Sequence, residues 1–309
     1  MRHVRGIAAN ASVALTLCLL AGGPAVRAAT LTDMLGRAVT VPEGALRVVS
    51  LAPSLTEIVF ALDRGDWLVG DTEFCDYPPA ARSKPKVGGP VTPNLERIVQ
   101  LRPSLVLITA EGNPLQTVAR LTQLGLSVFA VRPESYAGIL ASIQMLGRVL
   151  QAEATAAVLV RNIQDRSTAV QRAVQGRPRP RVLYLVWADP LVAAGPATFV
   201  SDLLEMAGGE NVVQERSVPY PHLGWEEVVG RAPEVILVAD HRDPDRPAAS
   251  KGALRTTWSK WQSVPAVRSG RILELPGDTI LRPGPRVVEG LEELARAIHP
   301  EVFARGESR

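Results

Sequence analysis

Residues 95–109 (LERIVQLRPSLVLIT) and 225–239 (WEEVVGRAPEVILVA) are two versions of one pattern, at a constant offset of 130 positions. Glu96 falls on Glu226, and the prolines of the two copies also coincide. Each copy predicts a short helix, a break at the proline and a buried apolar strand. Two copies so far apart indicate two similar lobes rather than a solenoid, which needs more repeats at a shorter period. Two lobes leave a cleft between them, and such clefts bind ligands.

Residues 1–28 are typical of a secretory signal peptide. A basic start is followed by an apolar run over residues 11–21 and by small residues over 25–29, so we expect cleavage near Ala28. The apolar run is too short and too weakly flanked for a stable membrane span. Lipidation at Cys18 is the less favoured alternative, because the cysteine lacks the small residue that usually precedes it.

Removal of this segment discards three arginines and leaves 31 basic and 31 acidic side chains. The mature chain is then neutral, and no basic stripe remains to indicate nucleic acid or an anionic membrane as a partner. About 280 residues are enough for two domains. Cys75 would be the one remaining cysteine, so the fold must depend on apolar cores. We interpret Cys75 as a buried packing residue, with a ligand-contacting thiol as the alternative.

Strands and helices alternate on both sides of a helical stretch, which predicts an α/β protein with parallel sheets. The stretch from 135 to 174 has no proline and only two glycines, and its apolar spacing indicates two helices, the second from about 152 to 174. We predict two Rossmann-like lobes joined by this single long helix. The predicted parts are the signal peptide (1–28), an N-terminal α/β lobe (29–134), a helical segment (135–178) and a C-terminal α/β lobe (179–309).

Smaller elements follow from turn and periodicity signals. Ser54 is predicted to cap a helix that ends at Leu62, with Glu57 as its capping-box partner. An edge hairpin is expected over 31–41, with Gly36 at its turn. Further strands are expected at 47–51, 67–70, 127–131, 181–186, 191–194 and 271–275, and further helices at 115–124 and 286–298.

Motifs of common enzymes are not present in the sequence. It contains no nucleophile elbow, no H-E-x-x-H and no phosphate-binding P-loop, so no catalytic residues are assigned. The three histidines of the expected mature chain, His222, His241 and His299, do not form the histidine-rich pattern of a receptor for a bare metal ion. Any metal is therefore expected inside an organic chelate rather than on a protein metal site.

Six strings in order along the chain carry a family resemblance: RVVSLAPSLTEIVFAL, TEFCDYPPAARSKPKVGG, NLERIVQLRPSLVLI, GGENVV, SVPYPHLGWEEVV and RPGPRVVEGL. They resemble the periplasmic substrate-binding proteins of ABC importers for metal chelates, most closely the cobalamin (vitamin B12) binding proteins. The likeness extends from about Arg47 to Ala297. It implies a class III periplasmic binding protein, monomeric and without catalysis. Its implied partners are a metal chelate and an ABC permease dimer with its ATPase.

The resemblance also implies roles for two acidic residues and for a set of cleft residues. Glu96 and Glu226 match the acidic residues that dock onto arginines of the permease, although each could merely favour a helix N-terminus. Ligand contacts are expected where strands end and face the other lobe. These candidates are Ser54, Phe74 and Tyr77 in the N-terminal lobe and Trp187, Tyr220 and Arg282 in the C-terminal lobe.

The bound ligand is expected to be cobalamin, with haem or a ferric siderophore as the alternatives, and no cofactor is expected. Aromatic side chains suit a flat corrin or porphyrin face. The resemblance departs at Pro90, Thr109 and Thr279, where cobalamin binders have tryptophan. Two features of the sequence suit haem or a ferric siderophore. Arg282 and Arg286 could contact propionates or catecholates, and Tyr220 or His222 could coordinate haem iron. An exported hydrolase or a protein-binding adaptor is the alternative of another class.

Overall fold

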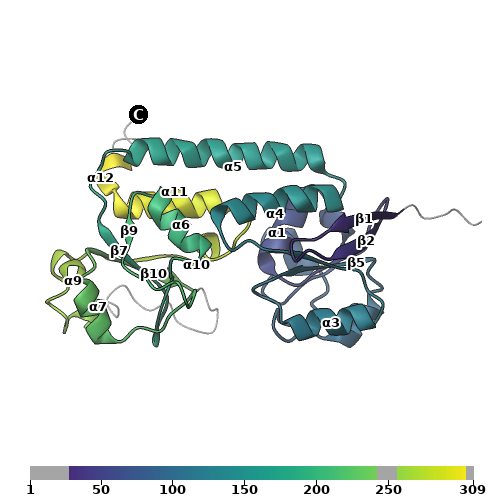
Figure 1. Ribbon diagram of the computed structural model, residues 1–309, viewed down its shortest axis with the longest axis horizontal. Coiled ribbons are helices and arrows are strands. Elements are labelled where there is room, and N and C mark those ends of the chain that lie inside the picture. The colour runs from purple at the N-terminus through teal and green to yellow at the C-terminus, as the bar shows by residue number, and fades with distance from the viewer. Residues whose placement is uncertain (1–27, 242–255, 304–309) are drawn as a thin grey trace, which may run out of the picture.

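Two lobes lie side by side beneath a layer of long helices (Figure 1). The structure is a computed structural model that describes residues 28–241 and 256–303. The predicted signal peptide, with Cys18, therefore lies outside the described residues, apart from Ala28. Within the described ranges, no helix has both the length and the apolar character needed to cross a membrane.

The two copies of the repeated pattern fold alike, as predicted. The first forms α2 (Leu95–Gln100) and β5 (Leu105–Thr109), and the second forms α7 (Trp225–Arg231) and β10 (Val235–Asp240). The likeness extends to the backbone, because the residue before each proline is left-handed: φ is 46° at Arg102 and 45° at Ala232. A right-handed helical conformation is disfavoured before proline, so both helices end at the same point of the pattern.

The N-terminal lobe has a four-stranded parallel sheet in the order β4-β3-β5-β6. The predicted hairpin lies beside it as two antiparallel strands, with Gly36 at φ 78° in the turn. The bounds of these strands are β1 Ala28–Thr32, β2 Ala38–Pro42, β3 Val48–Ser50, β4 Leu68–Gly70 and β6 Val128–Val131.

The C-terminal sheet repeats this order with one addition. Its path is β11-β10-β7-β8, and β9 pairs with β7; β8 is antiparallel and the other pairings are parallel. Without β8, the order β9-β7-β10-β11 matches β4-β3-β5-β6 strand for strand, which confirms two Rossmann-like lobes. The new strands are β7 Arg181–Ala188, β8 Leu191–Ala193, β9 Glu210–Asn211 and β11 Ile272–Pro276.

Helices cover both sheets and also connect them. The predicted pair between the lobes forms α4 (Tyr136–Val149) and α5 (Glu153–Val174), and α5 lies along one edge of the molecule, above both lobes (Figure 1). The other helices are α1 Pro53–Ala61, η1 Gly65–Trp67, η2 Pro79–Ser83, α3 Leu115–Gln123, α6 Phe199–Met206, α9 Pro265–Ser269, α10 Gly277–Ile280, α11 Val287–Ile298 and α12 Pro300–Phe303.

The central strands are buried on both faces, and the repeat preserves which residue faces which side. Leu105 and Leu107 of β5 belong to the core beneath the long helices, as do their counterparts Val235 and Leu237 of β10. The residues between them face two separate smaller cores, one in each lobe. Side chains alternate across a strand, so the aligned positions of the two copies present the same alternating faces to the shared core and to the smaller cores.

The core beneath the long helices is continuous between the lobes. It includes Leu55 of α1, Val160 of α5, Leu203 of α6 and Leu291 of α11. The sequence predicted a connection by one helix, and the structure adds that four helices, α4, α5, α6 and α11, pack over one shared core. Opening of the cleft by a large angle would expose part of this apolar surface, so we expect only small interlobe motions.

The predicted cap of α1 is wrong. Ala52 is the N-cap, Ser54 lies inside the first turn, and no side chain caps the helix. Pro53 explains the shift, because proline is favoured at the first helical position, where its missing N–H costs no helical hydrogen bond. Glu57 is therefore free for another role, described below.

Candidate functional site

A cavity lies between the lobes at the place where α/β sheets usually bind ligands. In the N-terminal sheet, β4 lies on one side of β3, whereas β5 and β6 lie on the other side. The direction in which strands are added therefore reverses between β3 and β5. Ligands bind beyond the carboxyl ends of strands at such a switch point. The residues after β3 and after β5 both line a cavity of about 310 Å³. Its lining comprises Ala52, Pro53, Ser54, Pro90, Thr109, Glu111, Gly112, Pro133, Phe199, Tyr220, Leu281, Arg282 and Pro283.

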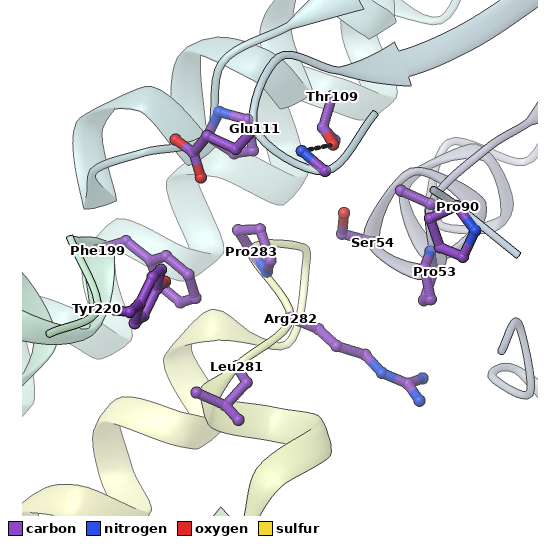
Figure 2. Close-up of a pocket in the computed structure, with 13 residues that line it drawn as sticks. Pro53, Ser54, Pro90, Thr109, Glu111, Phe199, Tyr220, Leu281, Arg282 and Pro283 are labelled. Carbon is purple, nitrogen blue, oxygen red and sulfur yellow. Dashed lines mark hydrogen bonds between the residues drawn. The ribbon is translucent and has the colours of Figure 1, made fainter. Parts of the chain in front are cut away.

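The two lobes supply different walls to this cavity (Figure 2). The C-terminal lobe contributes two rings, Phe199 and Tyr220, together with the segment from Leu281 to Pro283. The N-terminal lobe contributes prolines and small hydroxyl side chains, among them Ser54 and Thr109. The cavity volume is at the lower end of the range for small-molecule pockets, about 300–1,000 Å³. A corrin or porphyrin would therefore extend beyond it into the open cleft.

Three of the six predicted ligand contacts, Ser54, Tyr220 and Arg282, line this cavity together. Burial raises the pKa of the Tyr220 hydroxyl, although 37% of the residue remains exposed to the cleft. Phe74 and Tyr77 do not line the cavity, but both rings are solvent-exposed, Phe74 by 56%. His222 is also exposed and lies outside the lining.

Trp187, the remaining predicted contact, lies at the equivalent place of the C-terminal lobe. It is near the end of β7, and its ring packs against His241, which follows β10, at 4.7 Å between centroids. The strand order of this sheet reverses between β7 and β10, so this pair occupies the second switch point. The His241 Nε2 atom is also within 2.5 Å of the carbonyl oxygen of Val186, which fixes the ring orientation.

A cluster of five charged side chains joins the two lobes beside the cavity. Arg286 donates two hydrogen bonds to the Glu57 carboxylate, at 2.6 and 2.8 Å. Arg282 contacts Asp76 at 2.6 Å, Asp278 at 2.8 Å and Glu57 at 3.4 Å. Glu57 and Asp76 belong to the N-terminal lobe and the other three to the C-terminal lobe. We call these five residues the interlobe cluster.

The interlobe cluster is strongly desolvated at its centre. The Glu57 side chain is 1% exposed, and those of Arg286 and Arg282 are 13% and 16% exposed. Burial acts to raise the pKa of Asp76, but the hydrogen bond and charge of Arg282 outweigh it, so this pKa lies below its usual value. The Arg286 guanidinium also lies 4.1 Å from the centre of the Tyr77 ring, which ties this predicted contact to the cluster.

The loop that contains Phe74, Asp76 and Tyr77 is anchored by a second ion pair, between a buried aspartate and a half-buried lysine. Lys86 donates to Asp71 at 2.9 Å and to the carbonyl oxygens of Cys75 and Ala81. Cys75 is buried between the hydroxyls of Thr56 and Thr72, as the interpretation of a packing residue predicts. The anchor therefore positions the exposed part of the loop at the cleft.

We predict that Asp71 makes stability depend on pH. Burial, opposed by Lys86, raises the pKa of Asp71 to about 6, and one carboxylate oxygen has no partner among the described residues. A raised folded-state pKa stabilises the protein below the unfolded pKa, near 3.8, and this contribution is lost as the pH rises through 6. Relative to Asp71→Asn, the wild-type free energy of unfolding should gain about 2–3 kcal/mol between pH 7 and pH 4.

Urea titrations of both proteins at several pH values provide the measurement, with the exposed Asp165→Asn variant as a control that should leave the wild-type pH profile unchanged. Parallel pH profiles for the wild type and Asp71→Asn would contradict the assignment.

The two predicted docking residues occupy equivalent, exposed positions. Glu96 lies in the first turn of α2 and Glu226 in the first turn of α7. Helix α7 is at the edge of the molecule opposite α5, so Glu226 is remote from the shared core (Figure 1). Both acids also lie where a helix dipole favours negative charge, so their placement agrees with docking and with the simpler alternative.

Sequence reasoning missed three features of this site: the pairing of Glu57, the ring of Phe199 and the position of Glu111. The repeated pattern contained a signal for one of them. Extended two residues beyond its end, the offset of 130 places Glu111 opposite His241, each in the loop after its central strand. Among the described residues, no group of three or more His, Cys, Asp or Glu could hold a metal ion.

A cavity between two Rossmann-like lobes, beneath a shared helical core, defines a class III periplasmic binding protein. A family model described as periplasmic binding protein matches residues 48–279, and the chain belongs to this family. The family is one of substrate-binding transport proteins rather than enzymes.

Curated relatives and solved structures agree with this family. The vitamin B12-binding protein of Vibrio vulnificus (strain YJ016) is 29% identical over 249 residues, which cover 80% of this chain and 88% of the relative. The chain is also similar to the structure of the periplasmic vitamin B12 binding protein BtuF of Vibrio cholerae, with TM-score 0.73, 26% identity and coverage of 83% and 98%. The periplasmic heme-binding protein BhuT in complex with two hemes gives TM-score 0.74, 28% identity and coverage of 84% and 100%.

Proposed function

We propose that this protein is a periplasmic receptor that captures cobalamin or a related corrinoid between its lobes and delivers it to an ABC permease. The main support is the cavity that both lobes line at the N-terminal switch point, with two aromatic rings on one wall. The flat face of a corrin can pack on Tyr220, which is 37% exposed, and Phe199, only 3% exposed, supports that wall from behind. Relatives named vitamin B12-binding proteins support the choice of ligand.

Capture and delivery can proceed without large motions of the receptor. The shared core and the interlobe cluster hold the lobes at a nearly fixed spacing, so the ligand enters a preformed cleft. Exposed Glu96 and Glu226 then present one negative charge on each lobe to a symmetric permease dimer. We place the transport energy in the partner ATPase. Export by a cleaved signal peptide remains part of this proposal.

The direct test is a titration of the purified protein with cyanocobalamin, by calorimetry and by the cobalt corrin absorbance that remains after gel filtration. We expect one corrin per chain and a higher melting temperature with ligand, because a ligand that binds only the folded state stabilises it. Tyr220→Ala should weaken binding by at least tenfold, because it removes one aromatic wall. No heat and no retained corrin would contradict the proposal.

Haem is the second candidate. The structure of a heme-binding protein is as similar to this chain as that of the vitamin B12 binding protein, which favours testing haem. Incubation with haemin followed by gel filtration should leave no Soret band if the ligand is a corrinoid. A stoichiometric Soret band, together with no retained corrin, would instead assign the same cleft to haem. Ferric siderophores are tested in the same way by their charge-transfer absorbance.

A further inference from the structure

The charges at the cavity differ from those expected of a receptor for an anionic chelate. Among the described residues that line it, only Glu111 and Arg282 bear a formal charge. A receptor for carboxylates or catecholates would be expected to present at least one unpaired cation to them. Whether each of these two charges is already paired therefore decides which ligands the cleft accepts.

Arg282 is already neutralised by protein carboxylates. Its guanidinium contacts Asp76, Asp278 and Glu57, and Figure 2 shows it directed away from Glu111 and Tyr220. The interlobe cluster contains three acids and two arginines, so its positive charge is more than balanced. An anionic ligand group could use Arg282 only by displacing a carboxylate, which would then be left unpaired close to that anion.

Glu111, in contrast, has no ion-pair partner within the described ranges. It follows β5 at the switch point, it is exposed, and its carboxylate lies at the edge of the cavity (Figure 2). The same cavity is lined by Phe199 and Tyr220 of the C-terminal lobe. A ligand between these rings and the N-terminal lobe would therefore have a free negative charge beside it.

We propose that the cleft selects by charge: it accepts neutral or cationic chelates whose periphery donates hydrogen bonds, such as amides, and rejects chelates with peripheral carboxylates or catecholates. Glu111 is the specificity-determining residue, since it accepts hydrogen bonds from amide N–H groups and repels anions. The interlobe cluster completes the selection by keeping both arginines from the ligand. This inference rests on the proposed function and specifies the chemistry of its ligand.

Two pairs of probes test this selection, because one member of each pair has free carboxylates that the other lacks. Cyanocobalamin is compared with its monocarboxylic acid derivative, and haemin dimethyl ester is compared with haemin. For whichever ring system binds, we expect the member without free carboxylates to bind at least about tenfold more tightly at low salt. Added salt should reduce this ratio, because the Debye length falls to about 10 Å at 0.1 M.

Glu111→Gln is the informative variant, and Glu43→Gln, at an exposed acid after β2, is its matched control. We expect Glu111→Gln to reduce the ratio about threefold, the size expected for one exposed charge, and Glu43→Gln to leave it unchanged. Equal or tighter binding of the anionic member, or an unchanged ratio in Glu111→Gln, would overturn the inference. If only the porphyrin pair binds, the corrinoid function fails, while the ratio for that pair still decides the charge selection.

Discussion

Replacement of Glu57 by glutamine is expected to reduce the free energy of unfolding by about 3 kcal/mol, because it leaves buried arginine charge without its carboxylate. Glu57 is 1% exposed and accepts both hydrogen bonds of Arg286 as well as the longer contact from Arg282. Since these groups come from different lobes, the variant should also lower affinity for cyanocobalamin. Urea unfolding, followed by circular dichroism, measures the first effect and calorimetry the second.

A double-mutant cycle distinguishes this ion pair from general damage to the core. Arg286→Met alone should also lower the free energy of unfolding. The double variant with Glu57→Gln should lose clearly less stability than the sum of the two single losses, which gives a coupling energy of at least about 1 kcal/mol. The exposed pair Arg132–Glu134 is the matched control, and Glu134→Gln should change stability by less than about 0.5 kcal/mol. Additive effects, or a loss below 1 kcal/mol in Glu57→Gln, would contradict the role given to the interlobe cluster.

Charge reversal at both proposed docking acids, Glu96→Lys with Glu226→Lys, is expected to abolish uptake while ligand binding stays at the wild-type level. The reason is that two cations would face the cations proposed on the permease, so that encounter and register both fail. We expect the transport rate to fall on the order of 100-fold, as two unfavourable contacts of about 1.4 kcal/mol each imply. Uptake of labelled cyanocobalamin into cells that depend on this receptor gives the measurement.

The control for this experiment reverses two exposed acids elsewhere. Glu153→Lys with Asp165→Lys changes the net charge equally, on α5, at the edge opposite α7. This variant should transport at close to the wild-type rate. Normal uptake in the Glu96/Glu226 variant would contradict docking and would mean that the two acids only stabilise their helices. An equal loss of uptake in both variants would indicate a general effect of charge.

Most of the fold could be predicted because the chain repeats a local signal. Proline after each short helix and continuous apolar strands reveal β5 and β10, and the proline-free stretch reveals α4 and α5. The shared core could not be predicted, since Val160 and Leu291 meet through packing between helices far apart in the sequence. Periodicity identifies the apolar face of a helix but not its neighbour.

The site was less predictable for the same physical reason. Ser54, Tyr220 and Arg282 line one cavity, because they follow strands or lie in loops between the lobes, and their contact with a ligand stays a prediction. Glu57 misled the prediction: local spacing favoured a capping box, whereas the side chain pairs with Arg286, 229 positions away. Long-range charge pairs leave no local pattern, so only the folded chain reveals which arginines are free to meet a ligand.

The central claim is that one corrinoid lies between the lobes and contacts both. A crystal structure of the complex with cyanocobalamin, with anomalous data collected at the cobalt absorption edge, tests it most directly. The account predicts a single cobalt peak in the cleft, with the corrin in contact with Tyr220 on one side and Ser54 or Pro90 on the other. A cobalt peak outside the cleft, or a corrin held by one lobe alone, would contradict it.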